Sequence, residues 1–233
     1  MKQQARGWLG REFGLLLALF ALVVGTWVFI EVTDEVLEGE YRSLDESIVL
    51  ALRADEPPHT PVGPDWLEQA ALDVTALGGY SVLTLAILAV SGFLLLARAY
   101  QQLIMILTVT LSGLLITHGL KLLVARPRPM EALHLTTVST PAFPSGHAMN
   151  SAIIYLTLAA MLARMVRRRR LKLYIMTVAV LLTGAVGMTR VYLGVHYPTD
   201  VLAGWAAGIA WAAFAWLAVE LFSRWRDQKP SVL

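Results

Sequence analysis

The sequence predicts an all-α membrane protein with six transmembrane helices and a helical segment between the first two. Of its 233 residues, 57% are hydrophobic and only 15% are charged, whereas a soluble domain carries about 25% charged residues. Apolar runs long enough to cross a bilayer, roughly 17–25 residues, also recur along the chain. We therefore expect residues 1–233 to form a single integral membrane domain.

Six apolar runs define the expected spans. The fifth is short for a span. In the last run, Gly204 and Gly208 have the spacing of small residues that lets two helices approach closely, which we interpret as a packing feature. The runs cover residues 13–30, 79–96, 103–124, 148–166, 173–188 and 201–222.

The acidic segment between the first two runs is expected outside the membrane. Ser43-Leu44-Asp45-Glu46 has the spacing of a capping box, which predicts the start of a short helix. Prolines 57, 58, 61 and 64 break that helix, and Asp65 begins a second one. The pair fits interfacial helices beside a site and fits a structural connector equally well. The apolar face of the first helix is predicted from residues that recur every four positions: Leu44, Ile48 and Leu52.

Basic residues indicate the orientation. Thirteen of the 19 Lys and Arg precede the first run, lie between the second and third or the fourth and fifth runs, or follow the last. Because cytoplasmic loops are enriched in Lys and Arg, these segments and both termini are expected in the cytoplasm. The run Arg167–Arg170 fits a loop that faces lipid headgroups, so no nucleic-acid partner is expected. The sequence thus predicts an integral plasma-membrane protein, in a bacterium the inner membrane.

Three polar clusters stand at the ends of apolar runs, all on the predicted extracytoplasmic side. A charged side chain at bilayer depth costs on the order of 2.5–3.5 kcal/mol on insertion scales, so such residues indicate function. The groups present, namely cations, histidines, a carboxylate and a Ser-Gly turn, are those that bind phosphate and attack it. The clusters are Lys121-x6-Arg128-Pro129, Pro144-Ser145-Gly146-His147 and Arg190-x5-His196-x3-Asp200.

Each cluster also has a local rationale. Ser145 stands where it can cap the following helix, and Gly146 lets the backbone approach an anion at that helix start. Asp200 is expected about one turn from His196, where it accepts the Nδ1–H and leaves Nε2 as a nucleophile. Taken singly, the clusters also fit a capped helix start, first-turn charges and snorkelling cations. Arg126 is interpreted only as a snorkelling cation and is placed outside the site.

In this order and spacing, the clusters resemble the signature of the type 2 phosphatidic acid phosphatase superfamily. The family pattern is Lys-x6-Arg-Pro, then Pro-Ser-Gly-His, then Ser-Arg-x5-His-x3-Asp. This chain departs from it only at Thr189, which keeps the hydroxyl of the usual Ser. Three motifs together are specific, where one would be weak. The six-span architecture favours the membrane lipid phosphatases of the superfamily over its haloperoxidases.

The resemblance implies roles for the polar residues. His196 attacks phosphorus and forms a phosphohistidine, Asp200 orients it, and His147 protonates the leaving oxygen and later activates water. The phosphate oxygens are then held by Lys121, Arg128, Ser145, the Gly146 N–H and Arg190. Fixed cations can neutralise the charge of a transferring phosphoryl group, so neither a metal nor another cofactor is expected.

The leading hypothesis is a phosphohydrolase acting on lipid phosphates or pyrophosphates at the outer leaflet. Family analogy alone gives the candidate substrates, which are undecaprenyl pyrophosphate, phosphatidylglycerol phosphate, phosphatidic acid and lipid A phosphate. A lipid-to-lipid phosphotransferase would use the same motifs. A catalytically silent lipid-binding or transport module is the alternative from another class. The sequence predicts no oligomeric state.

Overall fold

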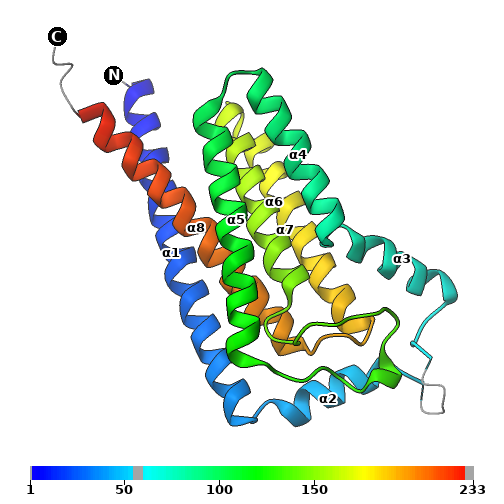
Figure 1. Ribbon diagram of the computed structural model, residues 1–233. Coiled ribbons are helices and arrows are strands. Elements are labelled where there is room, and N and C mark those ends of the chain that lie inside the picture. The colour runs from blue at the N-terminus through cyan, green and yellow to red at the C-terminus, as the bar shows by residue number, and fades with distance from the viewer. Residues whose placement is uncertain (1, 55–59, 229–233) are drawn as a thin grey trace.

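The computed structural model describes residues 2–54 and 60–228. Within these ranges the chain is helical, and its β-structure is limited to one isolated bridge between Arg53 and Pro61. This confirms the predicted all-α class. The elements, labelled in Figure 1, are α1 (Lys2–Glu38), α2 (Arg42–Ala51), α3 (Asp65–Ala76), α4 (Tyr80–Leu96), α5 (Tyr100–Val124), the short 3-10 helix η1 (Glu131–Leu133), α6 (Gly146–Met165), α7 (Arg169–Tyr192) and α8 (Pro198–Gln228).

In the part of the chain that the structure describes, five helical segments are long and apolar enough to cross a bilayer. They lie in α1, α5, α6, α7 and α8 and comprise Gly14–Glu38, Tyr100–Val124, Gly146–Met165, Arg169–Tyr192 and Pro198–Trp225. The pair α3 and α4 passes the same test together, with a bend of 44° at the break between them. The described chain is therefore a polytopic helical membrane protein, with α2 and α3 between its first two apolar stretches.

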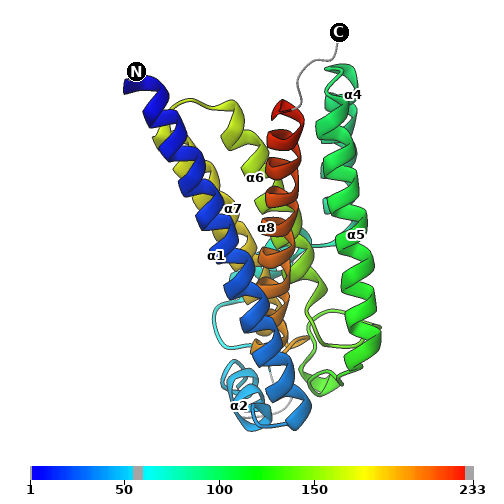
Figure 2. The same cartoon turned by 90° about the vertical axis from the view of Figure 1, so that its left-hand side faces the viewer.

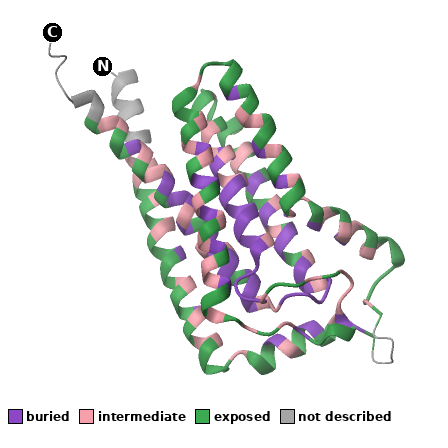
Figure 3. Ribbon diagram, viewed as in Figure 1, coloured by how far each residue is buried: buried purple, intermediate pink, exposed green. Residues whose placement is uncertain are grey.

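The helices form one elongated bundle in which α6 is the central member. It packs against α5, α7 and α8, while α1 lies along α8. Both termini and the α4–α5 connection lie at one end of the bundle, and α2 and the loop after α5 lie at the other (Figure 1). A view turned by 90° places the α6–α7 connection at the end with the termini (Figure 2). Buried residues gather in α6 and toward the end that carries α2 (Figure 3).

Two glycines bring α8 into backbone contact with α6. A Cβ added at Gly204 would lie 2.7 Å from the Ser145 carbonyl oxygen, and one at Gly208 would lie 2.7 Å from the Met149 oxygen. Larger residues would therefore separate the two helices. This close approach sets the beginnings of α6 and α8 side by side, where the Ser145 N–H donates to the Asp200 carbonyl at 2.9 Å. The second and third polar clusters are thereby joined through the main chain.

Helix α2 buries a side that the recurring apolar residues did not identify. Leu44 and Ile48 are 53% and 37% exposed, whereas Asp45 and Val49 are buried. The predicted capping box is also absent, because α2 begins at Arg42 and its cap makes no side-chain hydrogen bond. Asp45 is buried because its carboxylate finds hydrogen-bond partners inside the protein. Of the prolines expected to break this helix, 57 and 58 lie outside the described residues.

Helix α2 is fastened at its other end by a buried arginine. Arg53 donates from Nη2 to the Leu133 carbonyl at 2.8 Å and from Nη1 to the Tyr192 carbonyl at 2.9 Å. Val49 packs in the same cluster as Val201 of α8. These contacts fix α2 across the ends of α7 and α8, so it belongs to the packed structure.

Gly208→Ala is expected to lower the thermal unfolding temperature of the protein in detergent. Its Cβ would lie 2.6 Å from the Ala152 Cβ and 2.7 Å from the Met149 oxygen, and overpacking of this kind costs about 1–3 kcal/mol. Gly184→Ala is the matched control, because no atom lies within 4 Å of its added Cβ. Alanine favours helix by about 1 kcal/mol over glycine, so the control should melt at or above wild type. Equal melting of the two variants would contradict the close contact.

Candidate active site

The first polar cluster begins where α5 ends. Ala125 takes the left-handed conformation with φ of 47°, and its N–H bonds the Lys121 carbonyl at 3.0 Å, which closes the helix. Lys121 itself is 5% exposed, and its Nζ donates to the Pro141 carbonyl at 2.6 Å. The end of α5 thus turns an ammonium group inward toward the loop that leads to α6.

Residues 125–128 belong to no helix, and in Arg126-Pro127-Arg128-Pro129 each proline biases the arginine before it toward an extended conformation. Residues two apart in an extended chain point to the same side. Both arginine side chains therefore reach one pair of residues from the third cluster: Arg126 contacts Asp200, and Arg128 contacts His196.

His196 and Asp200 form a buried pair at the start of α8, with side chains 2% and 0% exposed. The His196 Nδ1 lies 3.4 Å from the Asp200 Oδ2, longer than a normal hydrogen bond; catalytic hydrogen bonds commonly tighten when substrate binds. The His196 Nε2 lies 3.2 Å from the Arg128 Nη1 on the other side of the ring. Burial, followed by the charge of Arg128, lowers the pKa of His196 well below its ordinary 6.5. The ring is therefore neutral at neutral pH, and because arginine can only donate, the lone pair of the His196 Nε2 faces Arg128.

The second cluster forms the beginning of α6. Ser145 occupies the cap position, but its Oγ makes no cap bond, contrary to the expectation from sequence, and has no partner among the described residues. A Cβ added at Gly146 would lie 3.5 Å from the Lys121 Cε and 3.7 Å from the Tyr80 hydroxyl. The free Ser145 hydroxyl and the Gly146 backbone thus stand at a helix start beside a lysine, which is a site suited to an anion.

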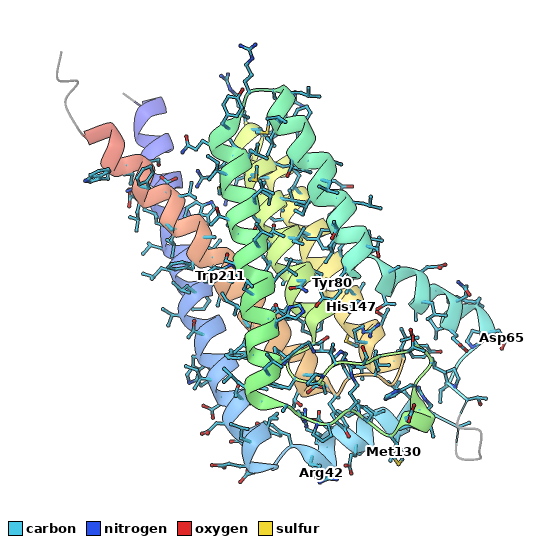
Figure 4. The ribbon with its side chains drawn as sticks, viewed as in Figure 1. Arg42, Asp65, Tyr80, Met130, His147 and Trp211 are labelled. Atoms are coloured by element: carbon cyan, nitrogen blue, oxygen red, sulfur yellow. The ribbon has the colours of Figure 1, made fainter. Side chains whose placement is uncertain are left out.

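His147 lies in the first turn of α6, against the glycine turn between α3 and α4. A Cβ at Gly78 would lie 3.3 Å from the His147 Cδ2, and one at Gly79 would lie 3.8 Å from its Nε2. Figure 4 shows His147 beside Tyr80, the first residue of α4. The cations of the other clusters and His196 are within charge–charge range of its ring. The structure therefore brings both histidines to one site.

Arg190 completes the cluster from the last turn of α7. It is 3% exposed, its Nη1 donates to the Thr75 hydroxyl at 3.0 Å, and its Nε has no partner in the described part of the chain. Thr75 belongs to α3, so this helix holds a phosphate-binding candidate in place. The only feature of the sequence that could have indicated this role for Thr75 is its position one turn after Ala71, on the inner side of α3.

Three buried or half-buried cations gather here without a carboxylate in ion-pair distance among the described residues. Lys121 and Arg190 bond a carbonyl and a hydroxyl, and the Arg128 Nε donates to the Thr140 carbonyl at 2.7 Å. Burial lowers the pKa of Arg128 despite the charge of Asp200. Buried charges are normally paired, so this cluster is suited to an anion with several oxygens, as phosphate has.

Arg126 differs from its predicted role as a snorkelling cation at the membrane edge. Its side chain is only 12% exposed and forms ion pairs with Asp200 at 2.6 Å and with Asp45 at 2.8 Å. The interpretation from sequence was wrong because both partners come from other helices. A second arginine two residues before Arg128, on the same side of an extended chain, was the available signal.

Among residues 2–54 and 60–228, no three His, Asp or Glu side chains come together as a metal site would require. The polar groups that do converge are cations, hydroxyls and backbone N–H groups, together with two histidines and Asp200. Such a donor set binds an oxyanion and can transfer its central atom to a ring nitrogen.

Known proteins resemble this chain in sequence and in fold. The family model of the PAP2 superfamily matches residues 101–224. Phosphatidylglycerophosphatase B of Bacillus subtilis strain 168 is 34% identical over 148 residues, which are 62% of this chain and 71% of the relative. The crystal structure of a transmembrane PAP2-type phosphatidylglycerolphosphate phosphatase from Bacillus subtilis is 26% identical, with a TM-score of 0.78 over 91% of this chain and 99% of its own.

A second solved structure, Aquifex aeolicus LpxE, is 23% identical and has a TM-score of 0.53 over 66% of this chain and 88% of its own, which supports the fold alone. The motif residues, their convergence and the family match agree. The chain belongs to the PAP2 superfamily and is an integral membrane lipid phosphatase.

Proposed function

We propose that residues 1–233 form a single membrane domain that hydrolyses lipid phosphates or pyrophosphates at the extracytoplasmic face through a phosphohistidine on His196. One observation carries the proposal. Three cations that have no carboxylate partner in residues 2–54 and 60–228, namely Lys121, Arg128 and Arg190, surround a neutral histidine whose Nε2 faces one of them at 3.2 Å. Phosphoryl transfer depends on positioning and charge neutralisation, and this arrangement supports both.

The reaction proceeds in two balanced steps. In the first, the His196 Nε2 bonds to phosphorus, the phosphorus–oxygen bond to the lipid breaks, and His147 gives its proton to the leaving oxygen. In the second, His147 takes a proton from water, whose oxygen attacks phosphorus and breaks the nitrogen–phosphorus bond. Asp200 stabilises the positive charge of the ring, and the cations, with Ser145 and the Gly146 N–H, bind the phosphoryl oxygens.

Phosphatidylglycerophosphate is the first candidate substrate, because the similar sequence and the similar crystal structure, both from Bacillus subtilis, are named for phosphatases of this lipid. Lipid pyrophosphates, including undecaprenyl pyrophosphate, are the second class. Phosphate release from a panel of these lipids by the purified protein tests the proposal. Adding an acceptor lipid distinguishes transfer to lipid from hydrolysis, and a single-turnover assay without product would indicate a silent lipid-binding or transport module.

The proposed orientation rests on where basic residues fall in the fold. Both termini and the α4–α5 connection share one end of the bundle (Figure 1), and the Arg-rich α6–α7 connection lies there too (Figure 2). Cytoplasmic loops are enriched in Lys and Arg, so this end is placed in the cytoplasm. The catalytic groups lie toward the other end. Five of the six basic residues there are held inside the protein, namely Arg53, Lys121, Arg126, Arg128 and Arg190.

Cysteine labelling should reveal this sidedness, because the chain has no cysteine of its own. An impermeant maleimide should label Thr60→Cys in intact spheroplasts, and it should label Arg168→Cys only after the membrane is opened. Both positions are exposed in the protein, so access to the reagent is decided by the membrane. The opposite pattern would place the site in the cytoplasm.

Turnover is expected to survive excess EDTA, because protein cations supply the charge neutralisation that a metal would provide. Vanadate, which mimics pentacoordinate phosphorus, should inhibit in the same buffer and serves as the control for an intact site. The measurement is phosphate release before and after chelation. Loss of turnover that Mg²⁺ restores would contradict the proposed role of Lys121, Arg128 and Arg190.

The two histidines should fail in different ways. His196→Ala removes the covalent step and should abolish turnover on every substrate. His147→Ala removes general acid–base assistance, typically worth about 10²–10⁴-fold, yet an activated nitrophenyl ester needs no proton on its leaving group. The first step should therefore be partly rescued with that ester, and the phosphohistidine should accumulate because its hydrolysis lacks a base.

The test uses a radiolabelled lipid phosphate and a nitrophenyl phosphate ester, with rapid quench and detection of acid-labile phosphoprotein. His118→Ala is the matched control, because this histidine lies exposed on α5 and its Nδ1 contacts the Leu114 carbonyl of the same helix. Labelled phosphoprotein in His196→Ala, or equal losses in both variants with no trapped intermediate, would overturn the assignment.

A further inference from the structure

Behind the proposed nucleophile, Asp200 continues into a buried chain of charges whose other two members, Arg126 and Asp45, have no role in the two steps above. Arg126 stands between two carboxylates, with its Nη1 2.6 Å from the Asp200 Oδ1 and its Nη2 2.8 Å from the Asp45 Oδ2. Both carboxylates are almost fully buried, at 0% and 1% exposed. The Arg126 guanidinium also lies over the Tyr197 ring, 4.5 Å from its centroid. Asp45 belongs to α2, so the chain connects this helix to the site.

The contacts of Asp200 divide its two oxygens between two tasks. Oδ1 accepts from Arg126, whereas Oδ2 accepts the Tyr197 N–H at 2.9 Å and faces the His196 Nδ1 at 3.4 Å. Arg126 therefore fixes the rotation of the carboxylate about its last bond. That rotation decides whether Oδ2 lies in line with the imidazole.

Asp45 accepts from the other terminal nitrogen of the Arg126 guanidinium, Nη2. Arginine pairs most strongly with one carboxylate through two parallel bonds, and a bidentate pair with Asp200 would draw Oδ2 away from His196. Because the Asp45 Oδ2 occupies Nη2, Arg126 offers Asp200 only one nitrogen. Burial disfavours the charged guanidinium, but the charge of Asp200 and the hydrogen bonds to both carboxylates outweigh it and raise the pKa of Arg126.

Asp45 also anchors the first turn of α8. Its Oδ1 accepts the Thr199 N–H at 3.1 Å, and its Oδ2 accepts the Thr199 hydroxyl, which in turn accepts from Arg126. The free N–H groups at a helix start need acceptors, and here a carboxylate from α2 supplies one. Thr199, which Asp45 holds in this way, directly precedes Asp200 in the chain. Asp45 thus positions Asp200 through the backbone as well as through Arg126.

The charges of this chain suit the proposed chemistry. Two carboxylates and one guanidinium keep a net negative charge behind His196, whose ring becomes positive when Nε2 bonds to phosphorus. A single buried pair of Arg126 with Asp200 would be neutral. The second carboxylate therefore preserves the stabilisation of the ring that Asp200 supplies.

We infer that Asp45 and Arg126 are positioning residues for the His196–Asp200 pair, which makes α2 part of the catalytic apparatus. This inference rests on the proposed transfer through His196. It assigns different tasks to the two arginines of Arg126-Pro127-Arg128-Pro129: Arg128 binds the phosphoryl group, and Arg126 orients the carboxylate behind the nucleophile.

The test compares Asp45→Asn and Arg126→Lys with Arg128→Lys. The first two should lower kcat about 10- to 100-fold, as misplacement of a catalytic group by about 1 Å does, with KM and the inhibition constant for inorganic phosphate unchanged. Arg128→Lys should instead raise KM and that inhibition constant. Glu46→Gln is the matched control on α2, because Glu46 pairs only with the exposed Arg42 at 2.9 Å in the described structure, and it should turn over as wild type does.

The double variant Asp45→Asn/Arg126→Lys should lose little more than either single variant, because both act on one carboxylate. Wild-type kcat in folded Asp45→Asn, or losses confined to KM, would overturn the positioning role. Should Arg126→Lys fail to fold, the isosteric Asp45→Asn decides alone. Wild-type protein that turns over without trapping a phosphohistidine would overturn the proposed function, whereas a trapped intermediate with unaffected variants would overturn the positioning role alone.

Discussion

The active end of this molecule depends on positive charge that is buried at helix ends. Lys121 closes α5, Arg190 closes α7, and Arg128 follows on the extended segment between α5 and α6, yet the described chain gives none of the three a carboxylate partner. Removing a charge from water without a partner is costly. The arrangement is maintained by carbonyls and hydroxyls that orient the cations without neutralising them. An anion with several oxygens is the ligand that such a cluster stabilises best.

This charge can be concentrated only because the helices that carry it start and end at one level. Gly204 and Gly208 let α8 contact the backbone of α6, so the starts of both helices meet and Ser145 bonds the Asp200 carbonyl. The start of α6 offers free N–H groups to an anion, and this packing places it beside His196 and Asp200 at the start of α8. The close packing of α6 and α8 along the bundle therefore also positions the site residues at its end.

Much of this could be predicted from the sequence, because membrane spans and the three motifs are local patterns. Each apolar run overlaps one long helix, and the motif residues converge. The pattern did not identify the buried side of α2, where the recurring Leu44 and Ile48 are exposed and Asp45 is buried. An apolar period marks only the side chains whose removal from water is favourable. It cannot anticipate a carboxylate whose partners, Arg126 and Thr199, are contributed by residues far along the chain.

The two arginines of the Arg-Pro-Arg-Pro segment also show that local sequence cannot predict partners contributed by distant residues. Local sequence makes Arg126 and Arg128 equivalent, since each precedes a proline and both leave one side of an extended chain. Their surroundings separate them: Arg126 has two buried carboxylates and a raised pKa, whereas Arg128 has carbonyls, a histidine and a lowered pKa.

A guanidinium held by two carboxylates is satisfied and orients its neighbours. One held by carbonyls keeps attraction for an incoming phosphate. The division of labour in this site is therefore set by where the acidic residues fall. With the roles proposed above, α2 determines through the buried Asp45 which of the two arginines remains available to the substrate.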